Sequence, residues 1–81
     1  MTRNIEVSKE IARMALRAKK AAEALVIMAE MRSLGYSFEM HVGTDGMFLS
    51  RFYLGGYAPG LLQSGETFCE SVCRAALEKC Q

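Results

Sequence analysis

Residues 36–54 read YSFEMHVGTDGMFLSRFYL, and this stretch predicts the β-hairpin that decides the fold. Two runs of alternating side chains flank the Thr-Asp-Gly at residues 44–46. That tripeptide suits a three-residue hairpin loop that ends with glycine in the left-handed conformation. Such a loop pairs Gly43 with Met47. Because side chains alternate between the faces of a strand, this pair fixes the register of the whole hairpin.

The predicted register gives the hairpin two different faces. The first face is almost continuously apolar, and it pairs Tyr36 with Leu54, Phe38 with Phe52, Met40 with Ser50 and Val42 with Phe48. The second face pairs Glu39 with Arg51, His41 with Leu49 and Ser37 with Tyr53. Opposite charges directly across two strands stabilise their pairing, so the charges of the second face support the register.

Length and composition predict a single small domain over residues 1–81. The chain has 81 residues, of which 51% are hydrophobic and 23% charged, and its formal net charge is +1. One core of this size contributes only about 3–5 kcal/mol, so oligomerisation or a bound partner is expected. The near-neutral charge does not match a dedicated nucleic-acid binder, which would have a strong basic excess.

The sequence predicts a cytoplasmic protein. Its longest uncharged apolar run, residues 24–29, is far shorter than the stretch of about 20 residues that crosses a bilayer. Its N-terminus carries charged residues where a signal peptide would have an apolar core. The three cysteines are an odd number at helical spacing, which favours reduced thiols over disulfides: Cys69, Cys73 and Cys80.

Residues 5–34 predict one long helix, because no glycine or proline interrupts them before Gly35. Apolar residues recur at steps of three and four, as in a packed helical seam: Ile11, Met14, Ala18, Ala21, Leu25 and Met28. A helix of this length would span about 45 Å, more than the hairpin can cover. We therefore expect it to overhang the sheet, to break, or to pack on another chain.

The C-terminal residues predict a second helix. Thr67 followed by Glu70 matches a capping box, in which the two side chains satisfy backbone groups at a helix start. The apolar residues that follow form one stripe: Cys69, Val72, Cys73, Ala76, Leu77 and Cys80. Between hairpin and helix, the turn-rich residues 55–65 predict a third strand or an extended loop around Tyr57.

These elements predict an α+β fold with a long N-terminal helix, an antiparallel sheet of two or three strands, and a C-terminal helix packed on the sheet. The expected core combines the first hairpin face with both helices. Its predicted members are Leu25, Met28, Phe38, Met40, Val42, Phe48, Phe52, Leu54, Val72, Cys73, Ala76 and Leu77.

No group of residues predicts catalysis, a cofactor or a metal site. Cys69, Cys73 and the only histidine, His41, are the residue types of a zinc site or a cysteine–histidine pair. Both cysteines, however, lie on the predicted core stripe, where thiols usually act as small apolar groups. His41 lies on the opposite face of the hairpin from that core. We therefore expect a protein without enzymatic activity.

Two surfaces are candidate binding sites. The first is the outward face of the hairpin, whose apolar side chains need a cover: Glu39, His41, Met47, Leu49, Arg51 and Tyr53. The second is a basic stripe on the first helix, which suits nucleic-acid phosphates or an acidic protein: Lys9, Arg13, Arg17 and Lys20. Glutamates among the basic residues dilute that charge, so the outward face of the hairpin is the first expectation.

Residues 65–77, GETFCESVCRAAL, resemble the C-terminal segment of the phage ABA sandwich family of small bacteriophage-encoded α/β proteins. In that family a glycine–acid–threonine turn leads into a helix that reads approximately Ala-Ile-Cys-Arg-Ala-Ala-Leu. Val72 stands where isoleucine is usual. The chain lacks the tryptophans of the family's strands, and its predicted first helix is longer. The resemblance implies a phage or prophage origin and no enzymatic activity.

The expected function is that of a non-enzymatic, dimeric protein-binding module in the host cytoplasm. The resemblance implies an inhibitor of a host factor, and a defence complex of the kind that anti-CRISPR proteins inhibit is the concrete version. The alternative is a nucleic-acid-associated regulator that uses the basic stripe. The order of elements also resembles a double-stranded RNA-binding domain, but the acidic start of the last helix, residues 65–70, would repel phosphate.

Overall fold

The computed structural model describes residues 2–55 and 60–80, with side chains from residue 5 onward. The elements are α1 (Thr2–Arg17), α2 (Ala21–Ser33), β1 (Tyr36–Val42), β2 (Phe48–Leu54), β3 (Gln63–Gly65) and α3 (Phe68–Cys80). The strands form one antiparallel sheet in the order β1-β2-β3. The predicted α+β class is confirmed.

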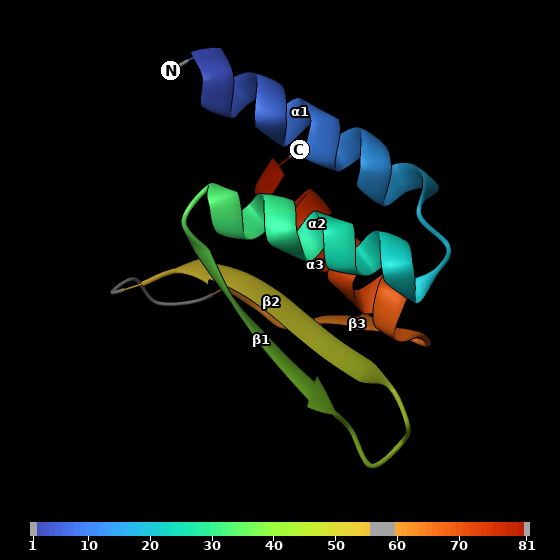
Figure 1. Cartoon of the computed structure of the whole chain (residues 1–81). Helices are drawn as coiled ribbons and strands as arrows, with labels where there is room; N and C mark the ends of the chain where they lie inside the picture. Colours follow the sequence, from blue (N-terminus) through green and yellow to red (C-terminus); the bar gives the residue numbers. More distant parts are fainter. Residues whose placement is uncertain (1, 56–59, 81) are drawn as a thin grey trace.

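The elements form three layers (Figure 1): the sheet, then α2 and α3 side by side, then α1. Helices α2 and α3 lie on the same face of the sheet, α2 over β1 and α3 over β2 and β3. Helix α1 forms the outer layer and packs on both α2 and α3. Because α3 has neighbours on most of its sides, small residues such as Ser71, Ala75 and Ala76 are fully buried on it.

The predicted hairpin is confirmed in its register and in its turn. All the strand pairs expected between β1 and β2 occur. At the turn, the Gly43 N–H donates to the Met47 carbonyl at 2.9 Å, and the Gly46 N–H donates to the Gly43 carbonyl at 3.0 Å. Gly46 has a φ of +85°, which a residue with a side chain rarely adopts. Local turn chemistry therefore positions both faces of the hairpin.

The helix expected over residues 5–34 breaks at residues 18–20 into α1 and α2. A single continuous helix is therefore wrong, and the break, one of the three expected outcomes, is confirmed. The Glu23 carboxylate accepts hydrogen bonds from the backbone N–H groups of Lys19 (3.0 Å) and Lys20 (3.1 Å). These bonds satisfy donors that a helix start leaves unpaired, and they lower the pKa of Glu23. The break places α2 beside α1, so both helices pack on α3.

The break also changes which residues of the second helix are buried. A continuous helix would bury Leu25, but Leu25 is 57% exposed and Ile27 is fully buried instead. Because α2 begins anew after residue 20, its apolar face is not in phase with that of α1. The observed core contains Ile11, Ala15, Ala24, Ile27, Met31, Phe52, Cys69, Val72, Cys73, Ala75 and Ala76, with Met28 partly buried against it.

The inner face of the hairpin is buried only where helices cover it. Phe52 is buried, and its ring centroid lies 5.0 Å from that of Phe38. Met40, Val42 and Leu54 are 39%, 60% and 42% exposed, so their assignment to the core is wrong. The hairpin extends beyond α2 toward its turn (Figure 1), which agrees with the exposure of Met40 and Val42.

The third strand of the sheet is β3, which pairs antiparallel with β2. The region around Tyr57, where a strand or loop was expected, lies outside the described residues. At the start of α3, the Thr67 hydroxyl accepts a hydrogen bond from the Glu70 N–H at 3.1 Å, which confirms the N-cap. The second half of the predicted capping box is different. The Glu70 carboxylate pairs with Arg74 at 2.9 Å instead of accepting a hydrogen bond from the Thr67 backbone N–H.

Candidate functional site

The outward face of the sheet brings the predicted partner-binding residues together. Helices α2 and α3 both pack on the opposite face, and over the described part of the chain no helix covers this one. Its side chains are half-buried or exposed: Glu39, His41, Met47, Leu49, Arg51 and Tyr53. Glu39 lies opposite Arg51, and His41 lies opposite Leu49, so polar and apolar groups are cross-strand neighbours.

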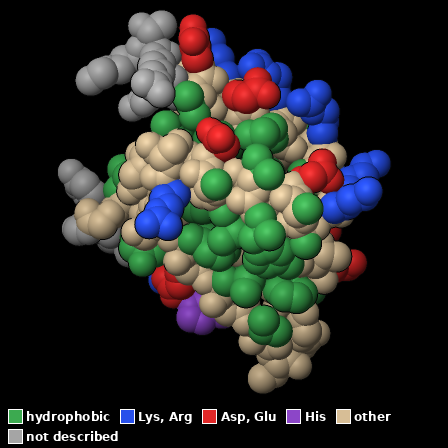
Figure 2. All heavy atoms as spheres, in the orientation of Figure 1, with side chains coloured by type: hydrophobic (Ala, Val, Ile, Leu, Met, Phe, Trp, Pro, Cys, Tyr) green, Lys and Arg blue, Asp and Glu red, His purple; other side chains and the backbone are tan. Residues whose placement is uncertain are grey.

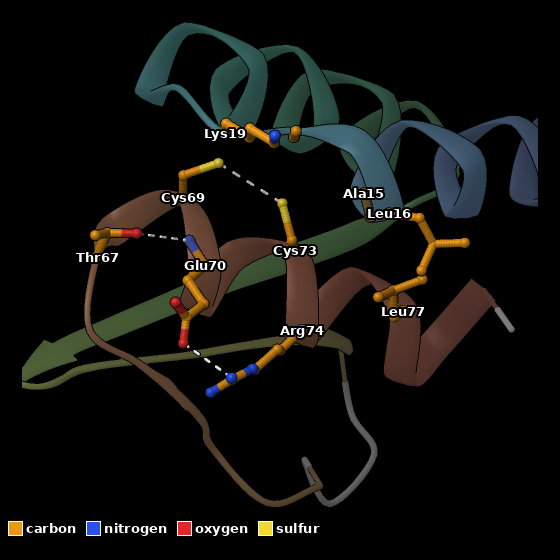
Figure 3. A pocket seen from close by; sticks show the side chains of 10 residues that line it. Ala15, Leu16, Lys19, Thr67, Cys69, Glu70, Cys73, Arg74 and Leu77 are labelled. Atoms are coloured by element: carbon orange, nitrogen blue, oxygen red, sulfur yellow. Dashed lines mark hydrogen bonds and ion pairs between the residues drawn. The ribbon is translucent and has the colours of Figure 1, made fainter.

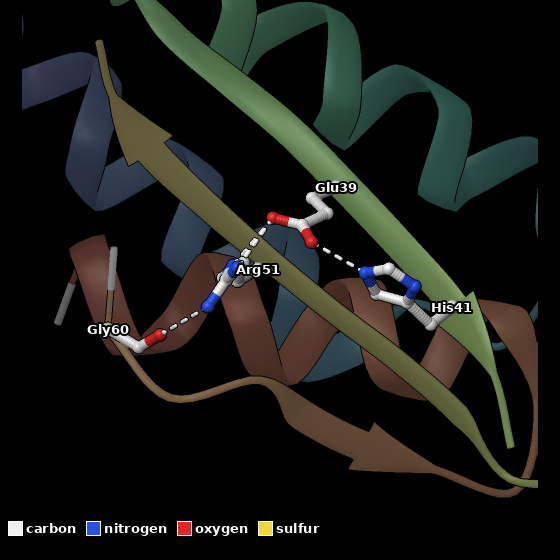
Figure 4. Close-up of polar contacts among 4 residues, drawn as sticks. All are labelled: Glu39, His41, Arg51 and Gly60. Atoms are coloured by element: carbon white, nitrogen blue, oxygen red, sulfur yellow. Dashed lines mark hydrogen bonds and ion pairs between the residues drawn. The ribbon is translucent and has the colours of Figure 1, made fainter. Parts of the chain in front are cut away.

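A polar network centred on Glu39 organises this face (Figure 4). The Arg51 Nε donates to Glu39 Oε1 at 2.8 Å, and the His41 Nε2 lies 2.5 Å from Glu39 Oε2. The Arg51 Nη1 also donates to the Gly60 carbonyl at 3.1 Å. The hydrogen bond with His41, and after it the bond from Arg51, hold the pKa of Glu39 below its ordinary value. Glu39 is therefore ionised at neutral pH.

Two contacts of this network were not predicted from the sequence. His41 lies two residues after Glu39 in the same strand, and residues at that spacing share a face. The spacing was thus a usable signal for the His41 contact. The Gly60 carbonyl had no such signal, because only the path of the chain after β2 brings it to Arg51.

This arrangement holds a charged side chain in place among apolar ones. Arg51 is held in place by a carboxylate and a carbonyl, and its neighbours along β2 on the same face are Leu49 and Tyr53. A fixed charge beside apolar side chains is common in protein interfaces. Among the described residues, no three or more His, Cys, Asp or Glu side chains come close enough together to hold a metal ion.

The cysteine pair lines a groove of about 440 Å³ between α1 and α3 (Figure 3). The Sγ atoms of Cys69 and Cys73 are 3.8 Å apart, and the two residues are only 5% and 6% exposed. Burial raises the pKa of the Cys73 thiol and also that of Cys80. All three cysteines are free thiols. A raised pKa keeps the Cys73 thiol protonated. Both residues of the pair are buried members of the core.

The basic stripe is only partly formed. Lys9, Arg13 and Arg17 are exposed on α1, but Lys20 follows the end of that helix, so the prediction that all four share one helix is wrong. Arg13 pairs with Glu10 at 2.6 Å, which lowers the pKa of Glu10 and offsets part of the positive charge. Figure 2 shows acidic side chains among the basic ones along this edge of the molecule.

A second apolar surface was missed from the sequence. A groove of about 610 Å³ lies between α2 and β1, with Leu25 and Met28 on the helix and Phe38 on the strand. Figure 2 shows hydrophobic side chains gathered on this side of the molecule. On the same face of the sheet, Met40 and Val42 are exposed nearer the turn. The sequence hid this surface because Leu25 was assigned to the core on the continuous helix, and Met40 and Val42 on the inner face of the hairpin.

Within the described residues, the longest and most apolar helices still fall short of what a membrane span requires. The resemblance of residues 65–77 to the phage ABA sandwich family stays a prediction. Comparison of the chain with protein-family models, with curated proteins and with solved structures gave no match in any of the three.

Proposed function

We propose that this chain is a non-enzymatic protein-binding module that contacts its partner through the outward face of the sheet. The observation that supports this most strongly is the position of Met47, Leu49 and Tyr53 on a face that no described helix covers. Antiparallel sheets normally leave only a polar face to water, so apolar side chains on both faces favour a second cover.

The polar network supports specific recognition on this face. The Arg51 side chain is 23% exposed and already held by Glu39, so it needs little reordering when a partner binds. The His41 side chain is 53% exposed at the edge of the network. Charges arranged in this way contribute mainly to the choice of partner and to the rate of association. A partner with an acidic group facing Arg51 and His41 would fit.

The finer proposal is that the chain is phage-encoded and inhibits a host factor such as a defence complex. It is supported by the resemblance of residues 65–77 to a phage protein family and by the lack of catalytic groupings in the sequence. A module of this size would inhibit by covering a functional surface of its target. In that case the residues of the outward face determine inhibition, and the cysteine groove does not.

Affinity capture from a host lysate, followed by mass spectrometry, tests this proposal. The wild-type chain is compared with Leu49→Glu and Tyr53→Glu on the outward face. The control is Leu16→Glu, because Leu16 is 66% exposed on α1, away from the sheet. We expect the wild type and the control to capture the same protein and both outward-face variants to lose it. Equal capture by all four chains would contradict the proposal.

A second candidate function is a nucleic-acid-associated regulator, favoured by the exposure of Lys9, Arg13 and Arg17 on α1. The affinity for duplex DNA and RNA should then fall steeply as the salt concentration rises. The slope of log affinity against log salt concentration should become shallower by about 0.9 for each phosphate contact removed. The variant with Arg13→Gln and Arg17→Gln measures that change. An absence of binding at low salt would eliminate this candidate.

A further inference from the structure

Strand β1 is an unprotected edge of the sheet. The sheet order is β1-β2-β3, so within the described part of the chain β1 has a strand on one side only. Edge strands normally carry a lysine, a proline or a bulge, which hinder pairing with another chain. Residues 36–42 contain neither lysine nor proline, and their pairing with β2 runs without a bulge. Their one acidic side chain, Glu39, is paired with Arg51 of β2.

The backbone groups of this edge are oriented for pairing. In an antiparallel pair, alternate residues turn their N–H and C=O groups toward the partner strand. Because the Gly43 N–H bonds to Met47 across the hairpin, the residues that turn away from β2 are the even-numbered ones. Phe38, Met40 and Val42 therefore turn N–H and C=O groups toward the edge, where no other described residue pairs with them. Their side chains lie on the same face of the sheet, next to the α2 groove.

We propose that two copies of the chain pair antiparallel along β1, around a two-fold axis at Met40. In this register Met40 lies opposite Met40 of the second copy, and Val42 lies opposite Phe38. On the other face, His41 lies opposite Glu39 of the second copy. The contact is self-complementary, as a two-fold interface requires. It extends the sheet across both copies.

The charge pattern of β1 selects this register. An axis at Glu39 would place the two Glu39 carboxylates directly opposite each other, which destabilises an antiparallel pair. An axis at Phe38 would place Glu39 opposite Ser37 and leave Val42 beyond the paired region. The axis at Met40 instead sets a carboxylate opposite an imidazole twice, while every pair on the inner face is apolar.

The position of α2 makes the two copies complementary in shape as well. Helix α2 covers the first half of β1, near Phe38, and leaves the second half bare at Met40 and Val42. Antiparallel pairing sets the bare half of each strand beside the covered half of the other. It brings α2 of the second copy, with Leu25 57% exposed, toward Val42, which is 60% exposed. The surface left open in one chain is thus covered by the other.

Light scattering and sedimentation of the intact chain test the dimer directly. One chain has a mass of 9.0 kDa, and we expect twice that mass at high micromolar concentration. Met40→Lys and Val42→Lys should each weaken the dimer at least about tenfold, because lysine opposes edge pairing. Both positions are exposed, so circular dichroism should show an intact fold. The control is Leu61→Lys, at a site that is 83% exposed and outside β1.

A strictly monomeric wild type would overturn the proposal, and so would a Val42→Lys variant that dimerises as tightly as the wild type. A dimer lost equally in the Leu61→Lys control would also overturn it. A monomer that captures a foreign extended peptide along β1 would assign the edge to a different occupant. The variants in this test change no side chain of the outward face, so their outcomes leave the proposed function to its own test.

Disulfide trapping tests the register. In the proposed pair the two Cα atoms at position 40 are about 5.5 Å apart, within the range of a disulfide. The two Cα atoms at position 37 are about 20 Å apart. Under mild oxidation, Met40→Cys should form a covalent dimer and the exposed Ser37→Cys should not. Cross-linking of Ser37→Cys in preference to Met40→Cys would reject the axis at Met40.

Discussion

The hydroxyl groups of Ser50 on β2 and Ser71 on α3 share a hydrogen bond of 2.8 Å, and both residues are fully buried. Ser71 also donates to the Phe68 carbonyl at 3.0 Å, which leaves Ser50 as the donor to Ser71. The bond joins the central strand of the sheet to the central helix. Two small side chains at this point allow the strand and the helix to pack closely.

We expect Ser71→Ala to lower the free energy of unfolding by about 1–3 kcal/mol, because it leaves the buried Ser50 hydroxyl without an acceptor. Ser50→Ala should have a smaller effect, since Ser71 keeps its bond to the Phe68 carbonyl. Urea denaturation of both variants measures the difference. Equal losses in the two variants would show that the direction assigned to this bond is wrong.

Gly65→Ala should also destabilise the fold, by about 1–3 kcal/mol, because it overpacks the contact between β3 and α3. A Cβ at Gly65 would lie 2.5 Å from the backbone nitrogen of Ser71, and backbone atoms cannot rotate away. The matched control is Gly55→Ala, whose Cβ would meet no atom of the described residues within 4 Å. Chemical denaturation should separate the two variants, and a neutral Gly65→Ala would refute the close approach.

Acid should destabilise the protein through the carboxylates whose pKa is lowered in the folded state. The backbone N–H groups of Lys19 and Lys20 lower the pKa of Glu23, and contacts with His41 and Arg51 lower that of Glu39. A carboxylate with a lowered pKa contributes its full stabilisation at pH values above its pKa in the unfolded state, which is near 4.5. This stabilisation is lost as the pH falls through the pKa of the group in the folded state. The unfolding temperature should therefore be level near neutral pH and fall below about pH 4.5.

The variant Glu23→Gln isolates the part of this effect that belongs to the helix break. At neutral pH it should melt at a lower temperature than the wild type, because an amide is a weaker acceptor for the two N–H groups. Below the folded pKa of Glu23 the two proteins should melt together. Thermal denaturation across the pH range checks this, and a difference that does not change with pH would contradict the role of the carboxylate.

Arg51→Lys should loosen the chain that leads into β3. The guanidinium reaches Glu39 and the Gly60 carbonyl at once, whereas an ammonium group is a single point charge and cannot hold both positions. Amide hydrogen exchange should increase in residues 60–65 and stay unchanged in α1. The control is Arg32→Lys, at an exposed arginine of α2. Equal exchange in both variants would show that Arg51 does not anchor this segment.

Interactions between residues close in sequence could be predicted correctly. The register of the hairpin follows from the Gly43–Met47 pair and from strict alternation along two strands, and both are local. The Thr67 N-cap is local as well, since its hydroxyl bonds a backbone group three residues away. The Glu39–Arg51 pair follows directly once the register is known. The outward face of the sheet, with its Glu39–Arg51 pair, was therefore predictable from the sequence.

The tertiary structure decided the rest, because local preference and long-range packing disagree at residues 18–20. No glycine or proline marks a break there, so a continuous helix is the local expectation. Splitting the helix lets both halves pack on α3, a gain that involves residues far along the chain. The split resets the phase of α2, buries Ile27 and exposes Leu25. The apolar groove beside β1 is lined on one side by Leu25 and Met28 of this separate helix.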